Sequence, residues 1–202
     1  MARTRLAGEE RSRAIVDATL GIFAKEGFAG ATTKRIADAA GVSEALVFKH
    51  FPTKDSLYRA IIERKIREVD RTFPLDDSGD EQDDEVRLTR LAASVLRRVE
   101  ADDAFLRLMV RSALDGHDLA RDFHRARTER VLSVLERRIR RRRRSRRRST
   151  PVDPAIAARL FHGMLFSTLM SRHVFAEPVL CRASRAKLSP ALARIFLKGI
   201  DG

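Results

Sequence analysis

Apolar residues recur every three or four positions along most of this chain, and no segment alternates between apolar and polar residues as a strand does. This spacing places apolar side chains on one face of a helix. The pattern therefore predicts an all-α fold class. The expected helices cover residues 9–26, two short segments within 33–51, the segment from 53 to 73, then 86–99, 104–114, 118–139, 155–174 and 191–200.

Glycines and short polar residues mark where these helices begin and end. The first helix is expected to end at Gly27, because glycine after the last apolar position is a common C-terminal signal. Thr33 and Ser43 are the expected N-caps of the second and third helices. Asp153-Pro154 and Ser189-Pro190 each join a capping residue to a proline at the first helical position, which predicts that the last two helices begin there.

The two short helices within 33–51 are joined by a tight turn at residues 40–43. Gly41 supplies the positive φ that a sharp turn between helices needs. The apolar residues of this segment can pack the two helices on each other: Ile36, Ala37, Ala40, Val42, Leu46, Val47 and Phe51. This pattern is typical of a helix-turn-helix DNA reader, whose second helix enters the major groove by its N-terminal end.

The positions that carry these features resemble the N-terminal domain of the TetR (tetracycline-repressor) family of transcriptional regulators. The matching positions run in register through roughly the first 60 residues: Ile15, Ala18, Phe23, Gly27, Thr32, Thr33, Ile36, Ala37, Ala40, Gly41, Val42, Ser43, Phe48, His50, Phe51, Lys54 and Leu57. The resemblance implies an N-terminal three-helix DNA-binding domain at 1–54 and a helical regulatory and dimerisation domain at 55–202. It further implies a repressor that binds a palindromic operator as a homodimer and responds to a small-molecule effector.

Nine residues are the candidate DNA contacts, from the helix-turn-helix and the start of the helix after it: Thr33, Lys34, Ser43, Glu44, Ala45, Phe48, Lys49, His50 and Lys54. Lys49 is the best candidate for a phosphate or a guanine. Glu44 either accepts a hydrogen bond from cytosine N4 or points to solvent. Phe48 stands where the family usually has tyrosine, so a hydroxyl contact to phosphate is missing there.

The last two expected helices bear on the oligomeric state. The family resemblance implies a homodimer through Ala155 to Val174 and Ala191 to Ile200, and the first of these helices is apolar on almost every side. A central core helix in a monomer is the alternative. Six residues are candidate liners of an effector pocket or plain core residues: Phe105, Met109, Phe123, His162, Met164 and Phe166.

Charge changes this picture in one place. The net charge is +13, and ten arginines fall within 137–148. The segment is expected to be extended or frayed beyond Arg140, because ten like charges repel one another. It is either a solvated loop or a surface that binds nucleic acid or another anionic partner without sequence preference. An acidic run at 76–85 is expected to be a solvated loop.

Other functional classes find little support in the sequence. The single cysteine, Cys181, excludes an internal disulfide and suits the cytoplasm. No apolar run has the roughly 20 residues that a membrane span needs. No arrangement typical of catalysis, of a metal site or of a cofactor stands out. Two rival hypotheses remain, an architectural DNA-binding protein that uses the arginine run, and an all-α enzyme or acyl-binding domain.

Overall fold

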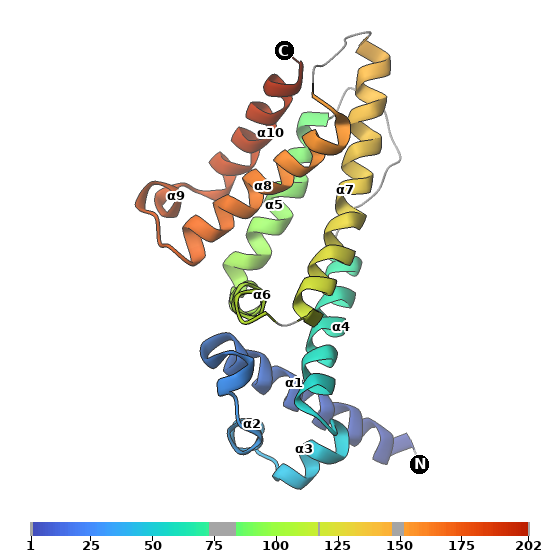
Figure 1. The fold of residues 1–202 in the computed structure, drawn as a ribbon, viewed down its shortest axis with the longest axis vertical. Coiled ribbons are helices and arrows are strands. Elements are labelled where there is room, and N and C mark those ends of the chain that lie inside the picture. Colours follow the sequence, from blue (N-terminus) through green and yellow to red (C-terminus); the bar gives the residue numbers. More distant parts are fainter. Residues whose placement is uncertain (1, 73–83, 117, 147–151, 202) are drawn as a thin grey trace. The chain divides into compact units, whose positions relative to one another are not determined.

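The computed structural model describes residues 2–72, 84–116, 118–146 and 152–201, and these form ten helices with no strand among them (Figure 1). The all-α prediction is therefore confirmed. The helices are α1 (Ala2–Gly30), α2 (Thr33–Ala40), α3 (Glu44–His50), α4 (Lys54–Thr72), α5 (Asp84–Ala101), α6 (Ala104–Leu114), α7 (Asp118–Arg146), α8 (Pro154–His173), α9 (Pro178–Arg182) and α10 (Arg185–Asp201).

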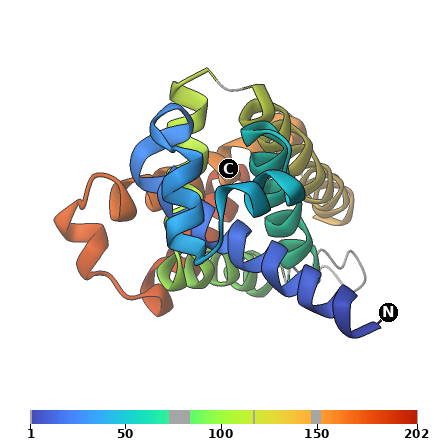
Figure 2. The ribbon, with the colours of Figure 1, turned by 90° about the horizontal axis from the view of Figure 1, so that it is seen from below.

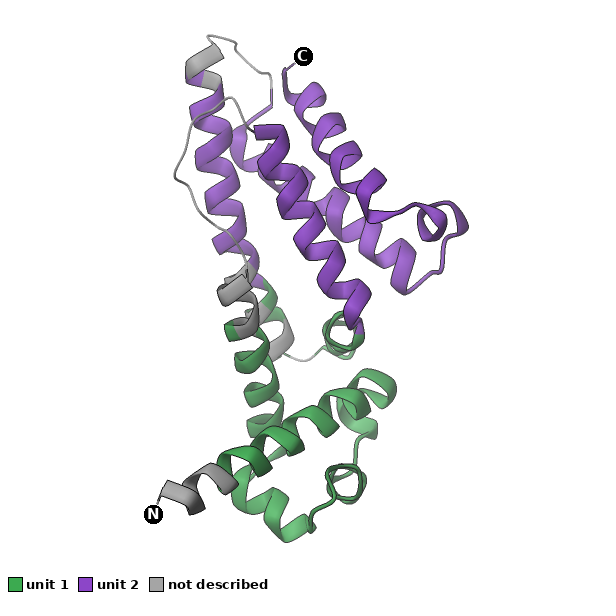
Figure 3. Ribbon diagram, turned by 180° about the vertical axis from the view of Figure 1, so that it is seen from behind, with its two compact units in different colours: residues 1–72, 104–124 green, residues 73–103, 125–202 purple. Residues whose placement is uncertain are grey.

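Two compact units divide the described chain (Figure 3). The first comprises residues 1–72 and 104–124, and the second comprises 73–103 and 125–202. By contacts, α4 and α6 thus belong with the N-terminal helices, and α7 contributes to both units. The sequence predicts a domain boundary between residues 54 and 55. The two units are defined by contacts and not by independent folding, so this boundary stays a prediction.

The core of the first unit is built from α1, α2, α3, α4 and α6. Its fully buried side chains include Ile15, Phe23, Ile36, Tyr58 and Leu108. The rings of Phe23 and Tyr58 lie 5.9 Å apart, a spacing that favours aromatic packing. Burial raises the pKa of the Tyr58 phenol, and Ser112 of α6 lowers it in part through its side chain.

The sequence predicts that the first helix ends at Gly27; α1 continues to Gly30, but Gly27 breaks its helical geometry with φ 76°. The guanidinium of Arg111 in α6 holds this break, because its Nη1 donates to the carbonyl of Lys25 at 2.5 Å. A Cβ at Gly27 would lie 2.7 Å from Arg111 Nε. The backbone conformation therefore favours glycine strongly at this position, and a Cβ would also displace the Arg111 side chain.

The core of the second unit lies between α5, α7, α8 and α10. Its buried residues are Leu88, Leu132, Leu135, Ile139, Ala157, Ala158, Phe161, Ala193, Phe196, Leu197 and Ile200. The Phe161 and Phe196 rings, whose centroids are 5.0 Å apart, join α8 to α10. Asp153 caps α8 as predicted, since its carboxylate accepts from the N–H groups of Ala155 and Ile156.

The start predicted for the last helix is wrong. Helix α10 begins at Arg185, and Ser189 and Pro190 lie inside it. The carbonyl of Ser184 accepts the first helical bond, from the N–H of Leu188, at 3.0 Å. Pro190 removes one N–H early in the helix, and Ser189 is only 2% exposed, so burial of this turn overrides the local start signal.

The predictions for the two charged runs are also wrong in their described parts. Helix α7 continues through Arg146, so the chain is neither extended nor frayed just beyond Arg140. Asp84, which the sequence placed in a solvated acidic loop, begins α5 and is 4% exposed. Residues 76–83 and 147–148 lie outside the described residues.

Candidate nucleic-acid interface

The chain turns sharply between α2 and α3 (Figures 1 and 2), and two backbone hydrogen bonds close this turn. The N–H of Val42 donates to the carbonyl of Ala37 at 3.0 Å, and the N–H of Gly41 donates to Asp38 at 3.2 Å. Gly41 has φ 66° and ψ 33°, the left-handed conformation. These bonds form a Schellman motif, which ends a helix and turns the chain sharply.

Three local contacts hold α3, a helix of seven residues that would be marginal in isolation. The hydroxyl of Ser43 accepts from the N–H of Leu46 at 3.2 Å, which confirms the predicted N-cap. The N–H of Phe51 donates to the carbonyl of Val47 at 2.8 Å at the other end. Val47 is 3% exposed and joins the core of the first unit, so one face of α3 is fixed against that core.

The opposite face of α3 is exposed. It carries Glu44, Ala45, Phe48 and Lys49, which lie at the spacing of one helix face. Half of the Phe48 side chain is accessible, although large apolar side chains are usually buried. Exposed apolar, acidic and basic groups on one short helix supply what base edges, thymine methyls and phosphates can bind.

At α2 the predicted cap is wrong by one residue. The cap is Thr32, whose hydroxyl accepts from the N–H of Arg35 at 3.3 Å, and Thr33 is the first helical residue. Lys34 is exposed beside it. Arg35, which sequence reasoning missed, is also exposed and pairs with Glu26 at 2.6 Å. Its position in the first turn of α2, beside Lys34, was the signal that could have made it a candidate for a phosphate contact.

Thr33, His50 and Lys54 are half-buried, whereas the other six candidates are exposed. The His50 ring lies against Phe51, with 6.3 Å between the centroids. The ammonium of Lys54 lies over the ring of Phe28, 4.8 Å from its centroid, in a cation–π arrangement. Lys54 lies within a capping box in which the Thr53 and Ser56 side chains each accept from the other's backbone N–H.

Replacing Gly41 with Ala should lower the free energy of unfolding by about 1–2 kcal/mol, because an L-residue is strained at positive φ. A Cβ there would meet no atom within 4 Å, so the loss reports backbone conformation alone. Gly21→Ala is the matched control, since its Cβ also meets open space but lies within a helix. There Ala should stabilise by about 0.5–1 kcal/mol. Urea unfolding measures both, and equal effects of the same sign would contradict the role given to Gly41.

The candidate effector liners fall in different parts of the fold. Phe105 and Met109 belong to α6 and pack on the core of the first unit. In α8, Met164 packs on the core of the second unit. The His162 and Phe166 rings stack with centroids 6.4 Å apart, and Phe166 is exposed. The side chain of Phe123 lies outside the described residues. An effector pocket formed by these residues stays a prediction.

Two features are absent from the part of the chain that the structure describes. No helix there is long and apolar enough to cross a membrane. The described residues also hold no group of three or more histidine, cysteine or acidic side chains arranged to bind a metal ion.

Comparison with protein families gives a match over the N-terminal helices. Residues 15–61 match the model of the bacterial regulatory proteins of the tetR family. This segment contains the turn at Gly41 and all of α3. Over 111 residues the chain is 26% identical to the nucleoid occlusion factor SlmA of Glaesserella parasuis, and the match covers 54% of each protein. The chain thus spans about half the length of that relative.

Solved structures extend the similarity over nearly the whole chain. A complex of SmeT with triclosan has a TM-score of 0.69 and 26% identity, with 94% of this chain and 90% of that chain covered. The transcriptional regulator FadR from Bacillus subtilis, in complex with stearoyl-CoA, has a TM-score of 0.70 at 16% identity, with 93% and 98% covered. The second likeness shows a shared fold.

Proposed function

Because the chain belongs to the TetR family of bacterial regulatory proteins, we propose that it represses transcription by binding a palindromic operator as a homodimer. The observation that carries the proposal is the exposed face of α3, formed by Glu44, Ala45, Phe48 and Lys49. A Schellman turn and a serine cap fix this helix, and a helix of this kind reads the major groove.

Sequence choice and affinity have different sources in this proposal. Glu44, Ala45 and Phe48 would face base edges and thymine methyls, and Lys49 would reach a guanine or a phosphate. Thr33, Lys34 and His50 would bind the phosphate backbone, which positions the protein without reading sequence. Lys54 would join them only by leaving the ring of Phe28. Ser43 would keep its capping bond and present the N-terminal end of α3 to the groove.

The homodimer is proposed on the exposed apolar side chains of α8 and α10. Ile156 and Leu160 are each 55% exposed, and Ile195 is 63% exposed. An exposed apolar patch of this kind marks an interaction site, and two copies related by a two-fold axis bury the same patch on each other. Two copies of α3 would then bind half-sites about one or more helical turns of DNA apart.

We further propose that a small molecule bound among the helices of the C-terminal half releases the operator. The SmeT and FadR structures, which contain triclosan and stearoyl-CoA, support this proposal. The chemistry of the effector of this chain does not follow from them. By linkage, an effector that lowers DNA affinity must bind less tightly to the DNA-bound protein by the same factor.

Lys49→Ala should lower affinity for the operator by about 5- to 150-fold, which corresponds to roughly 1–3 kcal/mol for a good base contact. The operator is first recovered by selection of bound duplexes from a random pool at near-physiological salt. Titration of that duplex with each variant then measures affinity. Lys25→Ala removes an equal charge from an exposed position of α1 and serves as the control.

A recovered palindrome that depends on Lys49 but not on Lys25 would support the proposed function. Recovery of no motif, or equal losses in both variants, would contradict sequence-specific binding by α3.

A further inference from the structure

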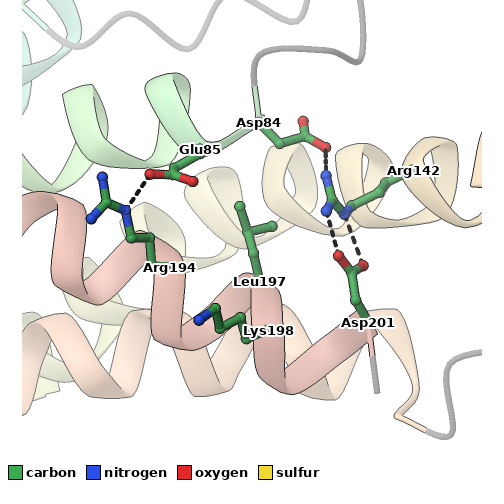
Figure 4. A pocket seen from close by; sticks show the side chains of 7 residues that line it. All are labelled: Asp84, Glu85, Arg142, Arg194, Leu197, Lys198 and Asp201. Carbon is green, nitrogen blue, oxygen red and sulfur yellow. Dashed lines mark hydrogen bonds and ion pairs between the residues drawn. The ribbon is translucent and has the colours of Figure 1, made fainter.

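The arginine run of α7 is divided into two faces by its contacts. Arg138 and Arg142, one helical turn apart, point into the second unit, and both form ion pairs with Asp84 of α5. Arg138 Nε lies 2.9 Å from Asp84 Oδ1, and Arg142 Nη1 lies 2.9 Å from Asp84 Oδ2. Arg142 also binds Asp201 of α10 with two donors, at 3.0 Å and 2.5 Å. Two arginines of the run are thereby neutralised inside the unit, and Figure 4 shows Arg142 between Asp84 and Asp201.

These bonds make the inner face a fixed anchor. The two hydrogen bonds to Asp201 are the main reason that the pKa of Arg142 is raised, and Asp84 adds to the effect against the cost of burial. Two parallel bonds from a guanidinium to a carboxylate fix direction as well as charge. The anchor lies beside a charged cavity of about 540 Å³ that Glu85, Arg194, Leu197 and Lys198 also line. It therefore ties α5, α7 and α10 together at one end of the second unit (Figure 4).

The outer face of α7 carries Arg137, Arg140, Arg141 and Arg144, all exposed. Their spacing of three, four and seven residues places them on one side of the helix. Arg140 pairs with Glu136 one turn earlier, with Nη2 and Oε1 2.7 Å apart. Exposed pairs of this kind contribute little to stability, so such a guanidinium can exchange its partner for another anion.

We propose that this outer face is a second nucleic-acid surface, which binds the phosphate backbone without reading sequence. Arg137 and Arg144 are seven residues apart, or about 10 Å along a helix. Duplex DNA carries one phosphate charge per about 1.7 Å of its axis, so a row of this length lies opposite several phosphates. Guanidinium groups bind phosphate with two donors, and the anchored helix presents them already ordered.

A lipid surface fits the same charges less well. A helix that lies on a membrane buries an apolar face beside its basic one. In α7 the apolar residues Leu132, Leu135 and Ile139 are at most 6% exposed and belong to the core of the second unit. These three described apolar residues of α7 are therefore held in the core and are not free to enter a bilayer beside the charged row.

The test compares two full-length triple variants with the same loss of charge. R137Q/R141Q/R144Q changes the outer face of α7. R90Q/R97Q/R182Q removes three exposed arginines from α5 and α9 in the same unit. Affinity for a random-sequence duplex is measured from low to physiological salt. The outer-face variant should lose about tenfold or more in affinity at low salt. The plot of log affinity against log salt concentration should become less steep by about three, since each phosphate contact contributes about 0.9 to its slope.

A third variant separates charge from folding. R137K/R141K/R144K keeps the charges and should keep most of the salt slope. The operator recovered by selection should be the same for all three variants, because the outer face reads no bases. Loss of the operator motif in Lys49→Ala, with arginine-dependent binding to random duplex intact, would show that the two surfaces act separately.

Three results would overturn the proposal. Equal losses in the α7 and control triple variants would reduce the effect to net charge. A lysine variant whose salt slope is reduced as much as that of the glutamine variant would show that phosphate neutralisation by charge is not the cause. Arginine-dependent binding to vesicles of anionic phospholipid, with unchanged DNA binding, would assign the face to a membrane.

Discussion

Asp84→Ala is expected to lower the free energy of unfolding by about 3–5 kcal/mol, the loss that follows when one partner of a buried ion pair is removed. The carboxylate of Asp84 is 4% exposed and accepts from both Arg138 and Arg142. Without it, the Arg142 guanidinium stays charged and largely buried, because its side-chain exposure is 9%, and it loses one of its carboxylate partners while keeping Asp201. Thermal and urea unfolding of the full chain measure the loss.

Glu85→Ala is the matched control, one residue further along the same first turn. Glu85 Oε1 lies 2.6 Å from Arg194 Nε, closer than the 2.9 Å pairs of Asp84, but the two side chains are 48% and 63% exposed. An exposed pair is expected to contribute about 1 kcal/mol or less. Asp84→Ala combined with Arg142→Met should recover part of the loss, since a buried apolar group replaces an uncompensated charge. Similar losses for Asp84→Ala and Glu85→Ala would refute the importance of burial here.

Local signals predicted the DNA-reading part of the fold well, because each depends on residues near in sequence. Gly41 ends α2 in the left-handed conformation, and Ser43 caps α3 through an N–H three residues away. The phase of α3 follows from Val47 in the core, which leaves Phe48 and Lys49 exposed. Each of these features depends on interactions between residues only a few positions apart in sequence.

The same reasoning was wrong where distant residues decide. Arg142 pairs with Asp84 and Asp201, which lie 58 and 59 residues away in sequence, so repulsion within the arginine run was an incomplete account. Inside the unit, the carboxylates of Asp84 and Asp201 and the burial of Ile139 outweigh the repulsion between the arginines and keep α7 helical. The start of α10 was misplaced for a similar reason, because Ser189 is buried by tertiary packing.

The candidate DNA contacts divide in the same way. Those of α3 follow from helix phase, whereas the position of the Lys54 ammonium over Phe28 depends on the packing of α1 and α4. The ion pair of Arg35 with Glu26 likewise joins two helices, and no pattern within α2 indicates it. Side chains whose partners lie on another element require the structure.

Substitution of both Leu160 and Ile195 with Asp is expected to convert the proposed dimer into a monomer. Each side chain is more than half exposed in one copy of the chain, so the change costs little within a protomer. In the dimer the new carboxylates would be buried without partners, at several kcal/mol for each charge. Sedimentation equilibrium measures the shift in mass.

Loss of the dimer should also lower operator affinity by about 10²–10⁴-fold, because two linked half-site contacts become separate binding events. V86D/V179D is the control, with two exposed apolar residues of α5 and α9 changed in the same way. It should remain dimeric and keep operator affinity. If the dimer survives L160D/I195D, or if both variants disrupt it equally, the exposed face of α8 and α10 is not the specific dimer interface. Monomers that still bind the full palindrome at the original affinity would show that each α3 acts alone.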